Sequence, residues 1–101
     1  MGYKVQILPT AWEDLKHIED WYYMNFNADT AAKVSNHILD CIERLEHFPE
    51  SGSLTLDPWL NDMGYRMVIA DRHIAVYKLI GENVYIYHIA DTRTQYTKLF
   101  Y

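Results

Sequence analysis

The chain opens with a segment in which apolar and polar side chains alternate, the pattern of a β-strand with one buried face. Within residues 3–8, Tyr3, Val5 and Ile7 fall on one side, and a lysine and a glutamine fall on the other. Pro9 follows, and proline cannot donate the backbone hydrogen bond that a strand ladder requires. We therefore expect a first strand over residues 3–8 that ends at this proline.

Two amphipathic helices are expected next, because apolar residues recur at the spacing that places them on one helical face. Thr10 and Glu13 have the spacing of a capping box, which predicts a first helix over about residues 10–24. The second should run over about residues 29–47 and stop before Pro49, because the residue ahead of a proline avoids helical geometry. With a short link between them, the two helices should form an antiparallel hairpin.

The remainder of the chain predicts an irregular segment and then three strands. Residues 49–63 contain several turn-forming dipeptides, so we expect a loop there. Strand patterns follow at residues 65–69, 74–79 and 84–90, separated by short turns. The apolar residues of the last strand run almost without interruption, which indicates an interior position in the sheet.

The element order β-α-α-β-β-β predicts an α+β fold, an antiparallel-meander sheet with the two-helix hairpin packed on one face. The chain has 101 residues, which is one ordinary domain spanning 1–101. Half of the residues are hydrophobic, so a single core can form without disulfides or metal ions. Cys41 is the one cysteine and falls among helix-patterned apolar residues, which indicates a buried thiol in a reducing compartment.

Membrane and export signals are not apparent in the sequence. No segment approaches the roughly 20 apolar residues that span a bilayer. The N-terminus lacks the apolar core of a signal peptide. We therefore expect a soluble, cytoplasmic protein with no membrane partner.

Charge is distributed unevenly along the chain. The formal net charge of −5 argues against a general nucleic-acid binder, because lysine and arginine make most phosphate contacts. The acidic residues crowd the first half, whereas the last third is mildly basic. A local basic patch therefore remains compatible with the sequence.

Taken in order, four stretches resemble the RelE/ParE toxins of type II toxin–antitoxin systems. Residues 3–11 resemble the family's opening strand and helix start, and residues 42–52 resemble its helix end, with leucine followed by proline and glycine. Gly-Tyr-Arg at 64–66, with the strand at 74–77, resembles the arginine strand and its neighbour. Residues 84–96 resemble the last strand and its arginine-bearing end. The likeness covers nearly the whole chain and implies the same fold.

The resemblance implies a toxin whose partner is a cognate antitoxin protein from an adjacent gene, as in plasmid-stabilisation modules. RelE-type members are mRNA interferases: in the ribosome, the 2′-hydroxyl of the messenger RNA attacks the adjacent phosphate, which inhibits translation. ParE-type members inhibit DNA gyrase and need no RNA chemistry. A third alternative is a member that is no longer toxic and only binds its antitoxin. The sequence leaves all three open, and the resemblance, through the size of the family's ribosome-dependent branch, favours the endoribonuclease.

Three residues are candidates for catalysis because they match positions that the resemblance assigns to RNA cleavage. Arg66 lies within a strand and Arg93 follows the last one, and arginine can offset charge on a phosphate transition state through its planar fork. We expect both to line one concave wall. Tyr96 could stack on a base or assist proton transfer. The structural alternatives are a strand arginine paired with helix acids, a solvated tail cation and a packing tyrosine.

Three further residues are candidates for substrate binding. Lys78 and Lys98 could contact phosphates, and His88 carries the natural acid–base group near neutral pH. Solvated surface lysines and a structural histidine are the alternatives. Against RNA cleavage, the loop over residues 53–63 contains no lysine or arginine, although ribosome-dependent relatives often place lysines there.

No metal or cofactor is expected. The sequence has no glycine-rich phosphate loop and no nucleophile elbow. His37 and Cys41 are four residues apart on one helix face, but two candidate ligands do not make a zinc site.

Overall fold

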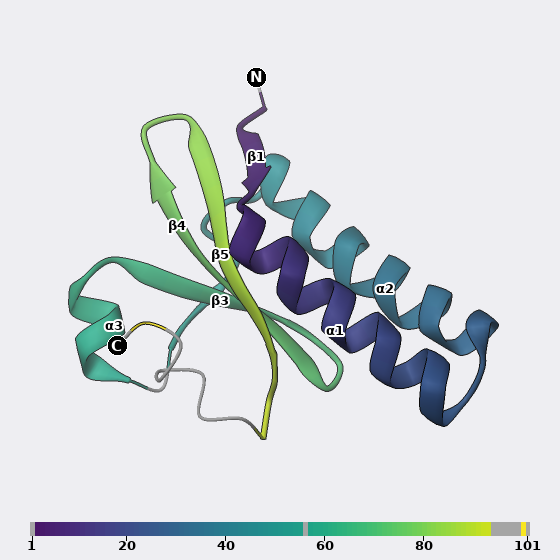
Figure 1. Ribbon diagram of the computed structural model, residues 1–101. Helices are drawn as coiled ribbons and strands as arrows, with labels where there is room; N and C mark the ends of the chain where they lie inside the picture. The colour runs from purple at the N-terminus through teal and green to yellow at the C-terminus, as the bar shows by residue number, and fades with distance from the viewer. Residues whose placement is uncertain (1, 56, 94–99, 101) are drawn as a thin grey trace.

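A computed structural model describes residues 2–55, 57–93 and 100 and shows one sheet with a helical hairpin beside it (Figure 1). Its elements are β1 (Lys4–Ile7), α1 (Pro9–Asn25), α2 (Ala28–Glu43), a 3-10 turn (Arg44–Glu46), β2 (Ser53–Leu54), α3 (Pro58–Asp62), β3 (Tyr65–Ala70), β4 (His73–Ile80) and β5 (Asn83–Asp91). The strands lie in the order β1-β5-β4-β3-β2. β1 is parallel to β5, and the other neighbours are antiparallel. The expected α+β class and the interior position of the last strand are confirmed.

The segment expected to be a loop, residues 49–63, contains the two-residue strand β2 and the short helix α3. A network between Thr55 and Asn61 shapes it. The Asn61 Oδ1 accepts from the Thr55 backbone N–H at 2.8 Å and from its hydroxyl at 2.7 Å, and the Asn61 Nδ2 donates to the Thr55 carbonyl at 2.9 Å. The sheet therefore has five strands among the described residues instead of the expected four. A strand of two residues is too short to show alternation in the sequence.

The predicted capping box at the start of α1 is wrong. Leu8 is the N-cap, and no side chain caps the helix there. The hydroxyl of Thr10 donates instead to the carbonyl of Tyr87 at 2.6 Å, a partner 77 residues away. A capping box assumes that the hydroxyl accepts from a backbone N–H of the same helical turn, so a distant carbonyl acceptor escapes it.

Side chains of α1 complete the edge of β5 where β1 stops. β1 pairs only with residues 83–86 of β5. Beyond that point Thr10 binds the carbonyl of Tyr87, and the carboxylate of Asp14 accepts a hydrogen bond from the Ile89 backbone N–H at 3.1 Å. α1 is thereby fixed along the second half of β5.

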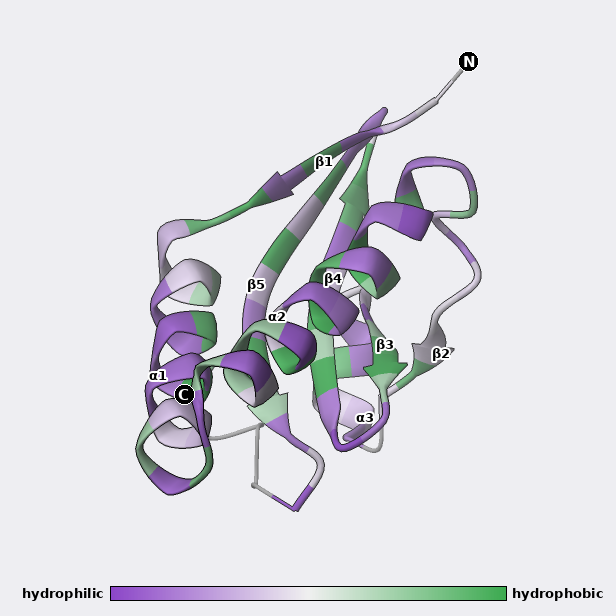
Figure 2. Ribbon diagram, turned by 90° about the vertical axis from the view of Figure 1, so that its right-hand side faces the viewer, coloured by the Kyte–Doolittle hydropathy of each residue, from purple (hydrophilic) through white to green (hydrophobic). Residues whose placement is uncertain are grey.

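The sheet buries apolar residues on both faces, and the alternation along the strands can be followed in Figure 2. The hairpin face, turned toward α1 and α2, includes Tyr77, which pairs across the ladder with Arg66. The opposite face is partly covered by α3, which buries Leu60 against Met67 and Val76. Within the described residues, no helix has the length and hydrophobicity that crossing a membrane requires.

Candidate functional site

Arg66 lies on the hairpin face of β3, where β2 pairs with it, and is partly buried. Its Nη1 donates to the carbonyl of Glu50 at 3.4 Å and to that of Gly52 at 3.2 Å. Its guanidinium therefore fixes the backbone ahead of β2. Among the described residues it forms no ion pair with an acid of the helices, so the alternative of a helix partner does not hold.

Arg93 follows β5 and is exposed, but its charge is already matched. Its Nε lies 3.2 Å from Oδ1 of Asp91, and its backbone N–H donates to the same oxygen at 2.8 Å. The hydrogen bonds from Arg93 lower the pKa of the Asp91 carboxyl and outweigh its partial burial, and the carboxylate in turn raises the pKa of the guanidinium. Asp91 thus acts as a local counter-ion.

The structure does not bring Arg66 and Arg93 together. Arg66 pairs with Tyr77, whereas Arg93 follows Asp91, which pairs with His73 and through it with Ala70. Ala70 is four residues beyond Arg66 along β3, or about 13 Å at the usual rise per residue. The expectation that both arginines line one wall is corrected accordingly. Their catalytic roles, and the role of Tyr96, which lies outside the described residues, stay predictions.

The substrate-binding candidates fall on or near the face opposite the hairpin. Nζ of Lys78 lies 5.1 Å from the centre of the Tyr65 ring. Nδ1 of His88 lies 2.7 Å from Oδ2 of Asp14, and its ring meets that of Phe100 edge-on at 5.0 Å. The contacts of His88 are those of a structural histidine, whereas Lys78 is neither a solvated lysine nor placed on a substrate by its contact with Tyr65. Lys98 lies outside the described residues.

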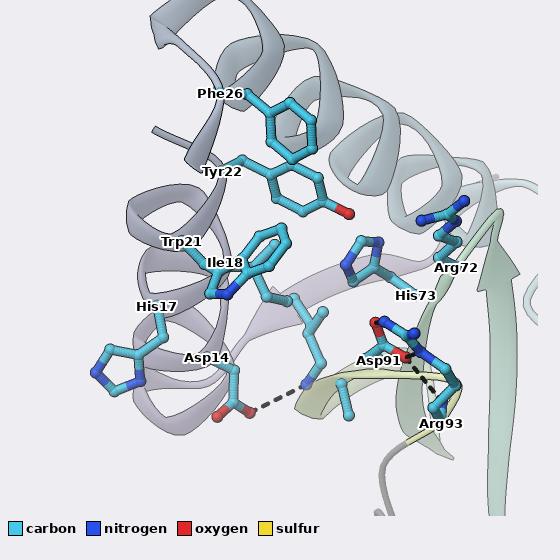
Figure 3. A pocket seen from close by; sticks show the side chains of 12 residues that line it. Asp14, His17, Ile18, Trp21, Tyr22, Phe26, Arg72, His73, Asp91 and Arg93 are labelled. Atoms are coloured by element: carbon cyan, nitrogen blue, oxygen red, sulfur yellow. Dashed lines mark hydrogen bonds and ion pairs between the residues drawn. The ribbon is translucent and has the colours of Figure 1, made fainter. Parts of the chain in front are cut away.

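A pocket opens between α1 and the end of the sheet where β4 begins and β5 ends (Figure 3). Its volume is about 560 Å³, within the range of roughly 300–1,000 Å³ that is usual for ligand sites. Aromatic and aliphatic side chains of α1 form one wall, and Arg72 and Arg93 stand on the opposite side. The lining residues are Asp14, His17, Ile18, Trp21, Tyr22, Phe26, Arg72, His73, Ile89, Ala90, Asp91 and Arg93.

His73 lies in the base of this pocket and is almost fully buried. Its ring meets that of Tyr22 edge-on at 5.8 Å, and Tyr22 stacks on Phe26 at the same centroid separation. Burial lowers the pKa of His73, and Asp91 only partly offsets this effect. The His73 imidazole at the bottom of the pocket is therefore neutral near pH 7.

Arg72 is the unmatched cation of the pocket rim. The carboxylate of Asp71, its neighbour in the β3–β4 turn, is directed to His37 on α2, with 3.3 Å between Nε2 and Oδ2. Asp91 is occupied by Arg93. In the part of the chain that the structure describes, Arg72 has no ion-pair partner. An anionic group could occupy this position without displacing an existing contact.

Exposed apolar residues continue the pocket wall around the end of α1. Trp21 is 54% exposed, Met24 80% and Phe26 61%. Clusters of this kind mark binding surfaces, because isolated apolar residues are common on protein surfaces but contiguous ones are not.

Sequence reasoning missed the pocket residues His73 and Arg72. Arg72 lies in the short turn between the first two predicted strands of the meander. A signal was available: the hairpin turn brings Arg72 next to the end of the last strand, as the pairing of His73 with Asp91 shows. The pairing of the two strands follows from a meander of hairpins. The position of α1 over these strand ends does not follow from the hydrophobic pattern of the sequence.

No metal site is evident among the described residues, where no group of three or more His, Cys, Asp or Glu could hold an ion. Nε2 of His37 lies 3.9 Å from the sulfur of Cys41, which is buried as expected. Burial raises the pKa of this thiol.

Comparisons with known proteins identify a family from the sequence and similar folds among solved structures. Residues 5–96 match the family described as "ParE toxin of type II toxin-antitoxin system, parDE". The fold is similar to the chromosomal ParDE system from P. aeruginosa, with TM-score 0.75, 19% identity and coverage of 88% of this chain and 95% of that one. It is also similar to a chain of the toxin–antitoxin complex RelBE2 from Mycobacterium tuberculosis, with TM-score 0.66, 14% identity and coverage of 90% and 99%. Among curated proteins no sequence matches significantly.

Proposed function

Since the chain belongs to the ParE toxin family of type II toxin–antitoxin systems, we propose that it acts by binding DNA gyrase and not by cleaving RNA. The observation that carries this proposal is that the guanidinium groups of the two arginines are engaged in separate contacts. Arg66 holds the backbone of Glu50 and Gly52, and Arg93 is paired with Asp91. A phosphate in a transition state requires cations that converge on it.

The overall charge supports a protein target. The net charge of −5 repels RNA at long range, so association with ribosomal RNA would be slowed. A toxin that acts through protein contacts is under no such constraint. Gyrase acts on DNA in the cytoplasm, so this proposal includes a cytoplasmic location.

The proposed neutralising partner is an antitoxin protein from the adjacent gene. The similar structures are described as a ParDE system and a RelBE2 toxin–antitoxin complex. This chain has a surface that such a partner can cover: the pocket and the exposed apolar residues at its border. An antitoxin segment that folds on binding could cover both.

A paired assay tests the proposal. Purified protein should inhibit supercoiling of relaxed plasmid by gyrase, and prior addition of the antitoxin should abolish the inhibition. Messenger RNA ends mapped after brief expression should show no new codon-phased cuts. A heat-denatured sample serves as the control for non-specific inhibition.

Two results would contradict the proposal, and each points to another member of the family. Codon-phased cuts that disappear in Arg66→Ala would identify a ribosome-dependent endoribonuclease. Absence of both inhibition and cuts, with tight antitoxin binding retained, would identify a chain that is no longer toxic.

A further inference from the structure

We infer that the pocket between α1 and the end of the sheet is the anchor site for an acidic, apolar segment of the antitoxin, with Arg72 as the residue that recognises its carboxylate. This inference rests on the antitoxin partner proposed above. It adds the place of contact and the chemistry of the segment.

The apolar half of the site is the α1 wall. Tyr22, Phe26 and Trp21 form a chain of ring contacts, with centroid separations of 5.0 to 6.0 Å. Tyr22 is partly buried, and the other two rings are more than half exposed. Large side chains in such a partly formed aromatic pocket are typical of residues that dominate binding energy.

The extent of the surface favours a polypeptide segment over a small molecule. A ligand confined to the 560 Å³ cavity would leave Met24 and much of Trp21 exposed. A segment that places one apolar side chain in the pocket and continues along the end of α1 would cover these residues too. Burial of apolar area contributes to affinity, so the longer occupant gains more.

The charged groups at the pocket rim determine which charged residue the antitoxin segment should carry beside its apolar side chain. Asp14 is engaged by the Ile89 N–H and His88, and Asp91 is engaged by Arg93. His73 has its pKa lowered by burial and adds no charge near pH 7. Among the described residues of the lining, Arg72 is therefore the guanidinium without an ion-pair partner, and a glutamate or aspartate of the segment can accept both parallel N–H donors of its guanidinium.

Arg72 can be substituted without disturbing the structure around it. It is exposed and lies in the β3–β4 turn, where the left-handed conformation belongs to Asp71 at a φ of 58° and not to Arg72. Its backbone carbonyl accepts from the Thr92 N–H at 2.8 Å, a bond that any residue retains. Substitution of the side chain should therefore leave the fold unchanged.

The test measures the dissociation constant of the full-length protein with the antitoxin encoded by the adjoining gene, at physiological salt. Arg72→Glu should raise this constant about thirtyfold or more, because it removes the cation that pairs with the segment's carboxylate and places a like charge opposite it. Arg72→Lys should lose less, because it keeps the charge but not the bidentate fork. The matched control is Lys16→Glu, an exposed cation on α1 outside the pocket lining, which should change the constant less than threefold.

A change below threefold for Arg72→Glu would overturn the inference while leaving the antitoxin partner intact. Failure of the unmodified chain to bind the antitoxin would instead overturn the partnership itself. Hydrogen exchange provides the second readout, and protection on binding should appear at residues 18–26 and 72–73. Protection confined to β2 and α3, or equal protection of these residues by a mixed-sequence RNA decamer, would overturn the assignment.

Discussion

Tyr77 connects the sheet to the segment ahead of β2 through a single hydroxyl group. The side chain is fully buried. Its hydroxyl donates to the carbonyl of Pro49 at 2.7 Å and accepts from the Gly52 N–H at 3.1 Å. Burial raises the pKa of this phenol, so the group keeps the proton that it donates. One residue thereby satisfies two backbone groups that would otherwise be buried without a partner.

Tyr77→Phe should lower the free energy of unfolding by about 2 kcal/mol, because two buried backbone groups lose their hydrogen-bond partner. Urea unfolding followed by circular dichroism measures the change. Tyr23→Phe, at a side chain that is 61% exposed, is the control and should change stability by less than about 0.5 kcal/mol. Equal stability of the two variants would show that the Tyr77 hydroxyl contributes nothing.

Gly52 should tolerate no side chain. A Cβ atom there would collide with the Tyr77 hydroxyl and would lie 2.7 Å from the carbonyl oxygen of Met67, which belongs to the backbone and cannot rotate away. Gly52→Ala should therefore destabilise the protein by about 2 kcal/mol or more, measured as a lower urea midpoint. The control is Gly2→Ala, whose new Cβ would meet first the flexible side chain of Glu46 at 3.3 Å. A Gly52→Ala midpoint as high as that of the control would refute the steric argument.

His73 should make the stability of the protein depend on pH. Burial lowers its pKa from the ordinary value near 6.5, so the unfolded chain takes up a proton that the folded chain does not bind. Stability should therefore be full above pH 6.5 and fall as the pH drops toward the folded-state pKa. The slope from one such group cannot exceed about 1.4 kcal/mol per pH unit.

Urea unfolding at several values between pH 7.5 and 5.5 measures this slope. His73→Gln should make it shallower, whereas His47→Gln, at an exposed position, should leave it unchanged. A slope that persists in His73→Gln would assign the pH dependence to other groups.

At the scale of elements, the sequence was sufficient wherever a local period repeats. The two helices and four longer strands show spacings that their own residues determine, and both of the expected hairpin turns are present. β2 and α3 could not be predicted, because two and five residues are too few for a period. Their position depends on Asn61 reaching back to Thr55, a contact with no sequence signature.

Asn61→Ala should loosen β2 and α3 without unfolding the rest. The substitution removes three hydrogen bonds to Thr55 and leaves the partly buried backbone groups of that residue unmatched. A loss of about 2 kcal/mol is expected, with faster hydrogen exchange confined to residues 53–67. Asn36→Ala, exposed on α2, is the control. Unchanged exchange in 53–67 would show that the network is dispensable.

At the scale of the molecule, the fold was predictable and the site was not. Arg66 and Arg93 were each recognised as candidates, yet their separation depends on strand register, which a sequence pattern does not provide. The pocket depends on how α1 crosses the end of β5. The exposed apolar residues at the end of α1 were likewise identified only from the structure.

The exposed surface at the end of α1 should limit the solubility of the isolated chain. Trp21→Gln combined with Met24→Gln removes two of its exposed apolar side chains and leaves the stacking of Phe26 on Tyr22 intact. In a precipitation titration, the double variant should remain soluble at about twice the protein concentration that the unmodified chain reaches. Phe48→Gln, at a side chain that is 66% exposed and lies outside the pocket lining, is the control. Equal solubility of all three proteins would contradict the argument.

The way Thr10 and Asp14 finish the ladder of β5 also bears on misfolding. Open strand edges act as templates on which foreign strands can add, and fibrils grow from such edges. Here helix side chains already occupy the carbonyl of Tyr87 and the N–H of Ile89, so the apolar second half of β5 has no vacant edge at these groups to recruit another chain. The same two side chains that hold a helix in place thereby protect the second half of β5 from added strands.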